Sequence, residues 1–192
     1  EERDVSFPGR GMDAPKTDTD LYRMELGAPV ANGGWNLMAW QADVDHVMDN
    51  FRLRAPDPTS MMPMPMASQV DRRTLGGRVA LTFELDKVEL VTGVDAQRSE
   101  HRARSSSYSM MTGYTDADEF AWEKDAVMRN VGLFSEATWY PSDTTRWIGG
   151  ARLDRAETKD YRQSISSMMG MATPNPTAGQ TRSDTLPSGT ET

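Results

Sequence analysis

Cysteine is missing from this chain of 192 residues, long apolar runs are missing too, and acidic residues outnumber basic ones. The lack of cysteine excludes disulfides and thiolate metal ligands within the chain. No stretch approaches the roughly eighteen consecutive apolar residues of a membrane-spanning helix, and a hydrophobic fraction of 37% is too low for a helical membrane protein. Because phosphate binding needs a basic stripe, a net charge of −8 argues against a nucleic-acid partner.

The pattern that is present has a period of two. Between Leu75 and Leu85 the odd positions carry apolar side chains or glycine, while the even positions are mostly polar or small. Residues 88–97 repeat the alternation, and only Leu-Asp-Lys lies between the two stretches. This pattern predicts two strands, each with one apolar face, joined as a hairpin.

Two further hairpins are expected, one on each side. The first pairs residues 20–27 with residues 35–52 across a short turn rich in glycine and asparagine. The last pairs residues 120–140 with residues 146–156 across the sequence Pro-Ser-Asp-Thr-Thr. We therefore predict about six strands in three hairpins.

The lengths of the connections predict the architecture. Turns within hairpins are short, whereas the connections that follow them, residues 53–70, 103–118 and 157–185, are long and polar. Short turns alternating with long loops are typical of a transmembrane β-barrel. The predicted fold is all-β, an antiparallel up-and-down meander that forms a segment of a large transmembrane β-barrel with long extracellular loops. A soluble antiparallel sandwich is the alternative, because its strands also alternate.

Two observations refine the barrel interpretation. Aromatic residues at the turn-side strand ends, Trp35, Tyr140 and Trp147, fit an interfacial girdle. Bacterial single-chain barrels have at least about eight strands, and an open ribbon of six leaves edges that lipid does not tolerate. We therefore interpret residues 1–192 as a partial transmembrane β-barrel and expect the chain to be a segment of a larger protein.

Several stretches resemble a known family. Residues 131–157 contain a Gly-Leu-Phe-x-Glu strand, a short turn and a Gly-Gly-x-Arg-x-Asp strand, and residues 91–104 look like another such strand. These motifs resemble the barrel strands of TonB-dependent outer-membrane receptors. Residues 43–54, residues 76–83 and the methionine-rich loops are most similar to the copper-receptor branch of that family.

The resemblance implies a barrel in the outer membrane of a Gram-negative cell that encloses an N-terminal plug and imports metal with energy from the inner membrane. It implies a metal ion, outer-membrane lipid and the TonB energy-coupling complex as partners. The chain departs from the family in having neither a plug nor an energy-coupling box. Contact with the coupling complex would run through the absent plug region, and the fragment alone would transport nothing.

His46 and Met48 are the main candidate ligands for copper. They lie two residues apart on a predicted strand, so both side chains leave the same face about 7 Å apart. Imidazole suits copper and a thioether selects the soft Cu(I) ion, so the pair would form half of a site at the barrel mouth. The resemblance implies that the plug completes the ligand set.

The alternation raises a difficulty for this half-site. Gln41, Asp43 and Asp45 occupy the opposite face of the same strand, and their polarity would place that face toward the lumen. His46 and Met48 would then point outward. We therefore expect that the two ligands face inward only if a β-bulge lies near residues 44–46.

Fourteen methionines are a surplus, and nine of them lie in the three predicted loops. Because four prolines keep loop 53–70 extended, burial in a core is not expected. Grouped over one mouth, the thioethers would gather Cu(I) before its transfer to the tighter site; alternatively, they are flexible apolar filler. The possible relay residues are Met61, Met62, Met64, Met66, Met110, Met111, Met168, Met169 and Met171.

Three functions remain open at this point. The first is a copper-importing receptor, the second a related receptor for an iron chelate (a siderophore), and the third a soluble β-rich copper-binding protein. No enzyme is expected, because the sequence has no His-Glu-x-x-His, no phosphate-binding loop and no Gly-x-Ser-x-Gly. His101, the only other histidine, stands among arginines and is interpreted as a solvated or lumen-facing residue.

Overall fold

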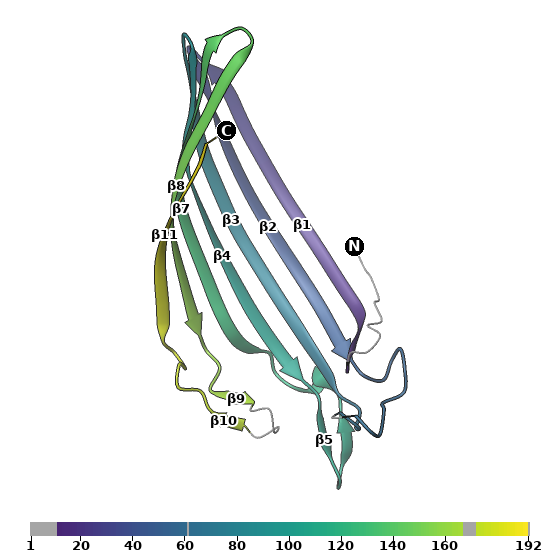
Figure 1. The fold of residues 1–192 in the computed structure, drawn as a ribbon. Coiled ribbons are helices and arrows are strands. Elements are labelled where there is room, and N and C mark those ends of the chain that lie inside the picture. Colours follow the sequence, from purple (N-terminus) through teal and green to yellow (C-terminus); the bar gives the residue numbers. More distant parts are fainter. Residues whose placement is uncertain (1–10, 61, 167–171, 192) are drawn as a thin grey trace.

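A computed structural model describes residues 11–60, 62–166 and 172–191. Its main element is one sheet of seven strands, in which each strand pairs antiparallel with the next (Figure 1). The strands are β1 (Asp13–Val30), β2 (Gly33–Asp49), β3 (Ala67–Leu85), β4 (Val88–Ser105), β7 (Glu123–Ser142), β8 (Thr145–Asp160) and β11 (Thr181–Glu191). The predicted all-β, up-and-down antiparallel fold is confirmed.

Short elements occupy two of the long connections, the one between β4 and β7 and the one between β8 and β11. β5 (Ser107–Ser109) and β6 (Gly113–Thr115) form a small hairpin, followed by the 3-10 helix η1 (Ala117–Glu119). β9 (Ser164–Ser166) and β10 (Ala172–Pro174) form a second one. In the described part of the chain, no helix has the length and apolar character needed to cross a membrane.

The connections between strands are short at one end of the sheet, which we call the turn end, and long at the other, the loop end. Connections of two residues, 31–32, 86–87 and 143–144, join the strands of each predicted hairpin. Asn32 and Asp86 have positive φ angles of 63° and 34°, a conformation that asparagine and aspartate tolerate better than other side chains. The tight turns therefore follow from local residue chemistry, and they fix the register of the long strands beside them.

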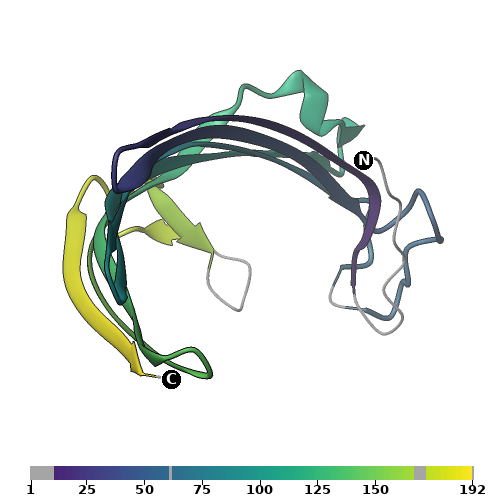
Figure 2. The same cartoon turned by 90° about the horizontal axis from the view of Figure 1, so that it is seen from above.

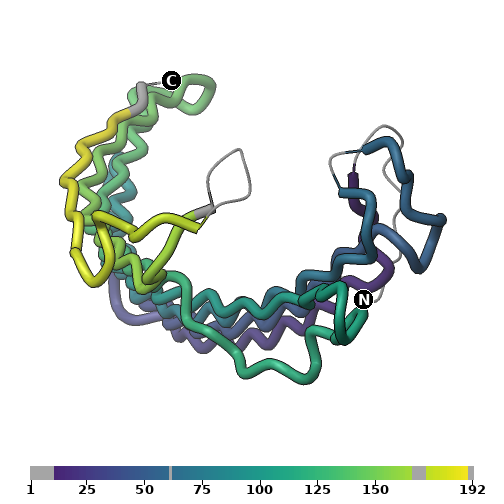
Figure 3. The backbone as a smooth tube through the Cα atoms, turned by 90° about the horizontal axis from the view of Figure 1, so that it is seen from below, coloured from purple at the N-terminus to yellow at the C-terminus, as the bar shows by residue number. Residues whose placement is uncertain are grey.

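The sheet bends into an open trough with a concave and a convex side (Figures 2 and 3). Both views place the segment between β4 and β7, which carries η1, on the convex side. Gln69 of β3 donates to Asp118 of η1 over 2.8 Å, and Arg104 of β4 pairs with the same carboxylate. Gln69 and Arg104 are directly opposite each other and both reach η1, so they point to the convex side. Every second residue counted from Gln69 along β3, and from Arg104 along β4, therefore points to the same side, and we call these residues the convex set.

The convex face is the apolar face predicted from the period-two pattern. One row of directly opposed residues, Val79, Val94, Leu133 and Leu153, crosses four strands, and all of them are exposed. Further exposed apolar residues on this face are Leu75, Leu81, Phe83 and Val131. Such a broad apolar surface needs an apolar environment around it.

Tryptophans mark the turn end of the convex face. Trp139 of β7 lies directly opposite Trp147 of β8, and their exposed fractions are 50% and 60%. Trp35 of β2 stands on the same face, opposite Leu81. Rings at the edge of an apolar band are typical of a membrane interface, as the sequence predicted for Trp35 and Trp147.

The boundaries differ from the prediction in several places. The main sheet has one strand more than the six predicted, because β11 lies partly within the predicted loop 157–185. β8 also extends to Asp160, β4 to Ser105, and β3 begins at Ala67 within the predicted loop 53–70. β11 contains Pro187 and Gly189 and lacks apolar alternation, yet as an edge strand it tolerates a residue without a backbone donor.

Candidate metal centre

His46 and Met48 point to the concave side of the sheet. In the β2–β3 pairing, His46 lies opposite Val70 and Met48 opposite Ser68, while Gln69, between them, belongs to the convex set. The pairing of β2 with β3 runs from Gly33 to Asp49 without a register shift. The expected β-bulge near residues 44–46 is therefore absent, and the two candidate ligands need none to face inward.

The prediction that Gln41, Asp43 and Asp45 face the lumen was wrong, because polar side chains also stand on the convex face. Gln41, opposite Leu75, and Asp43, opposite Arg73, lie on that face where its apolar residues end, on the loop side of the sheet. Polarity alone therefore does not identify the concave side near the loop end of a strand. The pairing partner identifies it, because directly opposed residues share a face.

His46 is held by a hydrogen bond to the neighbouring strand. Its Nδ1 lies 2.8 Å from Oγ1 of Thr17, the residue directly opposite it in β1. In the tautomer in which Nδ1–H donates to this hydroxyl, Nε2 keeps its lone pair for a metal ion. The contact therefore fixes the orientation of the imidazole and leaves one nitrogen available.

Asn50 fixes the connection that follows β2, which we call the methionine loop (residues 50–66). Its Nδ2 donates to the carbonyl oxygens of Met62 and Met64 over 3.0 and 2.9 Å, and its Oδ1 accepts from the amide of Met66 over 2.8 Å. The Asn50 amide also donates to the Met66 carbonyl. With 3% of its surface exposed, Asn50 is a buried clamp two residues beyond Met48.

The clamp brings three predicted relay residues to the end of β2. Met64 and Met66 are 37% and 42% exposed, and Met62 is half-buried. Met61 lies outside the described residues. At the tip of the same loop, the Thr59 hydroxyl and amide donate to Asp57, which lowers the pKa of that carboxyl below its ordinary value. The loop thus has an ordered turn and a fixed base.

The other predicted relay residues are placed differently. Met110 and Met111 stand at the tip of the β5–β6 hairpin, with 98% and 96% of their surfaces exposed. This hairpin leaves the sheet on the convex side, whereas β9 and β10 reach over the concave side (Figures 2 and 3). Met168, Met169 and Met171 lie outside the described residues. The structure therefore brings Met62, Met64 and Met66 near the strand of His46, but not Met110 and Met111.

Two fully buried carboxylates at the base of the loops were missed by sequence reasoning. Asp13 and Asp49 are both 0% exposed. Asp49 accepts from the amides of Phe51 and Arg52 and pairs with the Arg52 guanidinium at 3.3 Å, while Asp13 pairs with Arg54 at 2.9 Å. The pair Asp49-Asn50 at the end of a long predicted strand could have indicated a turn held by these side chains. The pairs shape the turn out of β2 into the methionine loop.

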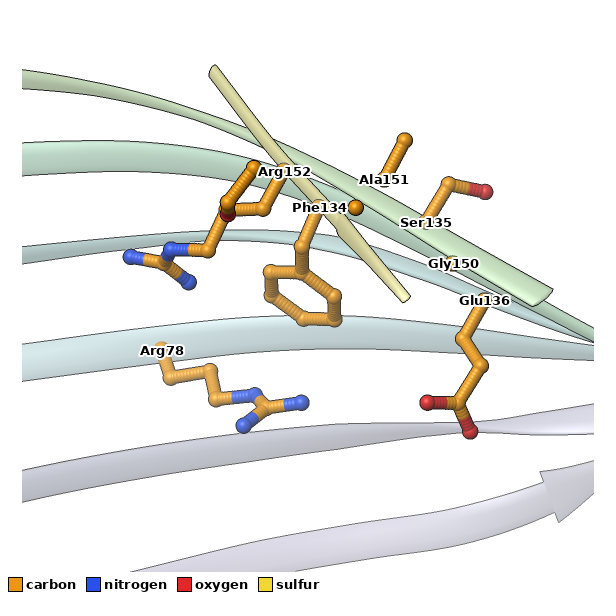
Figure 4. Close-up of a pocket in the computed structure, with 9 residues that line it drawn as sticks. Arg78, Phe134, Ser135, Glu136, Gly150, Ala151 and Arg152 are labelled. Atoms are coloured by element: carbon orange, nitrogen blue, oxygen red, sulfur yellow. The ribbon is translucent and has the colours of Figure 1, made fainter. Parts of the chain in front are cut away.

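The concave wall also carries an ion network that the sequence did not predict. Arg152 donates to both oxygens of Asp95 over 2.7 and 2.8 Å and to both oxygens of Asp154 over 2.7 Å. The Arg78 guanidinium lies 4.2 Å from the centre of the Phe134 ring. Figure 4 shows Phe134 between the two arginines, in a pocket of about 310 Å³. A polar, water-accessible wall is consistent with a lumen.

His101 also belongs to the concave set, opposite Arg72 of β3. Its Nδ1 lies 2.9 Å from the Asp125 carboxylate. Among the residues that the structure describes, no group of three or more histidine, cysteine or acidic side chains is arranged to hold a metal ion.

Comparison with known proteins identifies a relationship for the chain. No protein-family model matches it, and no curated protein matches it in sequence. Among solved structures, it is similar to one described as "Copper transporter OprC", with a TM-score of 0.89 and 56% sequence identity. The match covers 94% of this chain and 29% of that chain. The predicted relationship to a copper receptor is confirmed, and this chain spans 29% of the length of the protein it matches.

Proposed function

We propose that this relative of a copper transporter forms part of the wall of an outer-membrane receptor that binds copper ions and imports them. Its 56% identity to the copper transporter, over 94% of the chain, is the observation that carries the proposal. The convex apolar band would face the hydrocarbon of a Gram-negative outer membrane, and the concave face would line the lumen. The function is transport and not enzymatic catalysis.

Within this receptor, His46 Nε2 and the Met48 sulfur would supply half of a Cu(I) site. Both side chains belong to the concave face, and the Thr17 hydroxyl holds the other imidazole nitrogen. A neutral imidazole and a thioether suit soft copper better than hard cations such as Mg²⁺ or Ca²⁺. The remaining ligands would come from the plug, whose contact with the TonB complex would couple import to energy.

The methionine loop would deliver the ion to this half-site. Asn50 holds the backbone of Met62, Met64 and Met66 at the end of the strand that carries His46. Thioethers exchange Cu(I) readily with one another because each is a soft, weakly bound, neutral ligand. Met61, Met168, Met169 and Met171 would extend the relay, and Met110 and Met111 would make a first contact outside it.

Copper binding by the full-length receptor tests the half-site. The variant with His46→Ala and Met48→Ala should bind Cu(I) at least about tenfold more weakly in competition with a chromogenic chelator, because two of the ligands are gone. The matched control combines His101→Ala with Met38→Ala. It removes the same residue types from the same concave face, and its affinity should equal that of the unmodified receptor.

Equal Cu(I) affinity in the two double variants would refute the assignment of His46 and Met48. Metal analysis of the purified receptor tests the wider proposal. Copper should be found at about one ion per receptor after growth with copper, and an iron chelate in place of copper would refute copper import while leaving the barrel fold intact.

A further inference from the structure

One arginine stands beside the candidate half-site on the concave face. Arg72 of β3 lies directly opposite Val44 of β2, and the next pair on the same face toward the loop end is Val70 with His46. Arg72 and His46 are therefore diagonal neighbours across the two strands, a relation that places such residues about 7–8 Å apart. No register shift interrupts the β2–β3 pairing, so this spacing follows from the backbone.

The Arg72 side chain is exposed and has no carboxylate partner in the described part of the chain. Its acidic neighbour in the sequence, Asp71, belongs to the convex set and pairs with Arg102. Across β4, Arg72 faces the imidazole of His101, whose Nδ1 lies 2.9 Å from the carboxylate of Asp125. The positive charge of the Arg72 guanidinium is therefore not compensated by an acidic side chain.

Acidic side chains are missing from the concave wall around His46, as far as the structure describes it. In the rows of directly opposed residues from His46 to Ala42, strands β1 to β4 carry only threonine, serine, alanine, valine and leucine besides the two histidines and Arg72. The first acidic side chains of these strands on this face lie deeper, Glu25 and Asp95, and each is paired with an arginine. The closest formal charge to His46 on this face is therefore a positive one.

A fixed positive charge beside a metal site weakens the binding of a divalent ion more than that of a monovalent ion. At a separation of about 7–8 Å, Coulomb's law with an effective dielectric constant between those of water and a protein surface predicts about fivefold weaker binding per unit of metal charge. A monovalent ion would lose about fivefold in affinity and a divalent ion about 25-fold. The ligand atoms alone do not make this distinction, because imidazole also suits Zn²⁺ and Cu²⁺.

We propose that Arg72 is a specificity-determining residue, which makes the half-site prefer a monovalent soft ion, Cu(I) or Ag(I), to divalent ions such as Zn²⁺ and Cu²⁺. This inference rests on the proposed function, because it concerns the same site at His46 and Met48. The ligand atoms select for softness, and the guanidinium selects for charge. Mg²⁺ and Ca²⁺, which need several oxygen ligands, are disfavoured on both counts.

The affinities of the full-length receptor for Cu(I), Ag(I) and Zn²⁺, measured by chelator competition, test this inference. Arg72→Gln should bind Cu(I) and Ag(I) about fivefold more tightly and Zn²⁺ about 25-fold more tightly, so the preference for monovalent ions should fall about fivefold. Arg72→Lys retains the charge and should retain the preference of the unmodified receptor. Arg72→Glu reverses the charge and should lower the preference about 25-fold.

The matched control is Arg78→Gln, which removes the same charge from the same strand and the same face. Arg78 lies further toward the turn end of β3, roughly 20 Å from Arg72 at about 3.3 Å per residue, which exceeds the Debye length. The metal affinities of this variant should equal those of the unmodified receptor. Salt gives a second readout: at about 1 M, the preference of the unmodified receptor should fall toward that of Arg72→Gln.

An unchanged preference in Arg72→Gln would overturn the inference. Equal weakening of all three ions in that variant would overturn it too, because Arg72 would then support the structure of the site and not its selectivity. The two proposals fail in different ways. A receptor that binds no Cu(I) would refute the proposed function and the inference with it, whereas Cu(I) binding that depends on His46 and Met48, with a preference unaffected by Arg72→Gln, would refute the inference alone.

Discussion

Replacing Asn50 with aspartate should release the methionine loop from the end of β2. Aspartate has the shape of asparagine, so packing around this buried position is preserved. The substitution removes both donors, however, which serve the carbonyl oxygens of Met62 and Met64. Of the side-chain contacts, it keeps only the oxygen that accepts from the Met66 amide, and the backbone bond from the residue 50 amide to the Met66 carbonyl is unaffected. The substitution therefore tests the two donated hydrogen bonds without changing the size of the side chain.

The size of the effect follows from these contacts. Each lost neutral hydrogen bond contributes about 1 kcal/mol net. A carboxylate with only 3% exposure, facing two carbonyl oxygens, adds about 1 kcal/mol or more of unfavourable burial. The free energy of local opening should therefore fall by about 3 kcal/mol, which accelerates amide exchange in the loop about a hundredfold.

Hydrogen–deuterium exchange of the peptide covering residues 62–66 in the full-length receptor measures this opening. The control is Asn175→Asp, because Asn175 clamps a different connection by donating to Asp160 and to the Arg162 carbonyl. That variant should leave residues 62–66 unchanged and accelerate exchange around residues 160–177. An unchanged exchange rate at Met66 in Asn50→Asp would refute the clamp, and with it the fixed position of the loop thioethers.

Three further substitutions test other parts of the wall. Thr17→Val removes the partner of His46 and should weaken Cu(I) binding about tenfold in chelator competition, whereas Thr19→Val, on the same face, should not; equal affinities would contradict the orienting role. Arg152→Gln leaves the Asp95 and Asp154 carboxylates facing each other on the concave wall. The free energy of unfolding should fall by up to about 2 kcal/mol after allowance for solvent screening, and the unfolding temperature should fall with it; an unchanged melting curve would contradict this. Gly93→Ala places a methyl group 2.2 Å from the Val79 carbonyl oxygen and should reduce the heat-resistant folded fraction on gels, while Gly149→Ala meets open space and should not; equal folded fractions would contradict the close approach.

Strand alternation made most of the fold predictable. The apolar set from Leu75 to Leu85 predicted the face of β3 that points to the convex side, and the short turns predicted which strands are neighbours. β11 was not predicted, because its alternation is lost around Pro187 and Gly189 and its position depends on pairing with β8. Edge pairing is a tertiary effect that a local pattern does not encode.

The sequence predicted that His46 and Met48 share one face of a strand, but it did not predict which face or what surrounds them. The spacing of His46 and Met48 placed them on one face, but the sequence suggested the wrong face, because Gln41 and Asp43 are polar and still point outward. Polar side chains stand on both sides of a barrel wall beyond its apolar band, so their presence does not select a side. The clamp by Asn50 joins residues 12 to 16 positions apart, and no sequence motif announces it.

The odd number of strands in the sheet restricts how the wall can be closed. In an antiparallel meander of seven strands, the first and the last run in the same direction, so β1 and β11 cannot pair with each other in the antiparallel sense. Both edges expose backbone donors and acceptors that hydrocarbon does not satisfy. A cylinder that stays antiparallel throughout therefore requires an odd number of additional strands between these two edges, which gives an even total.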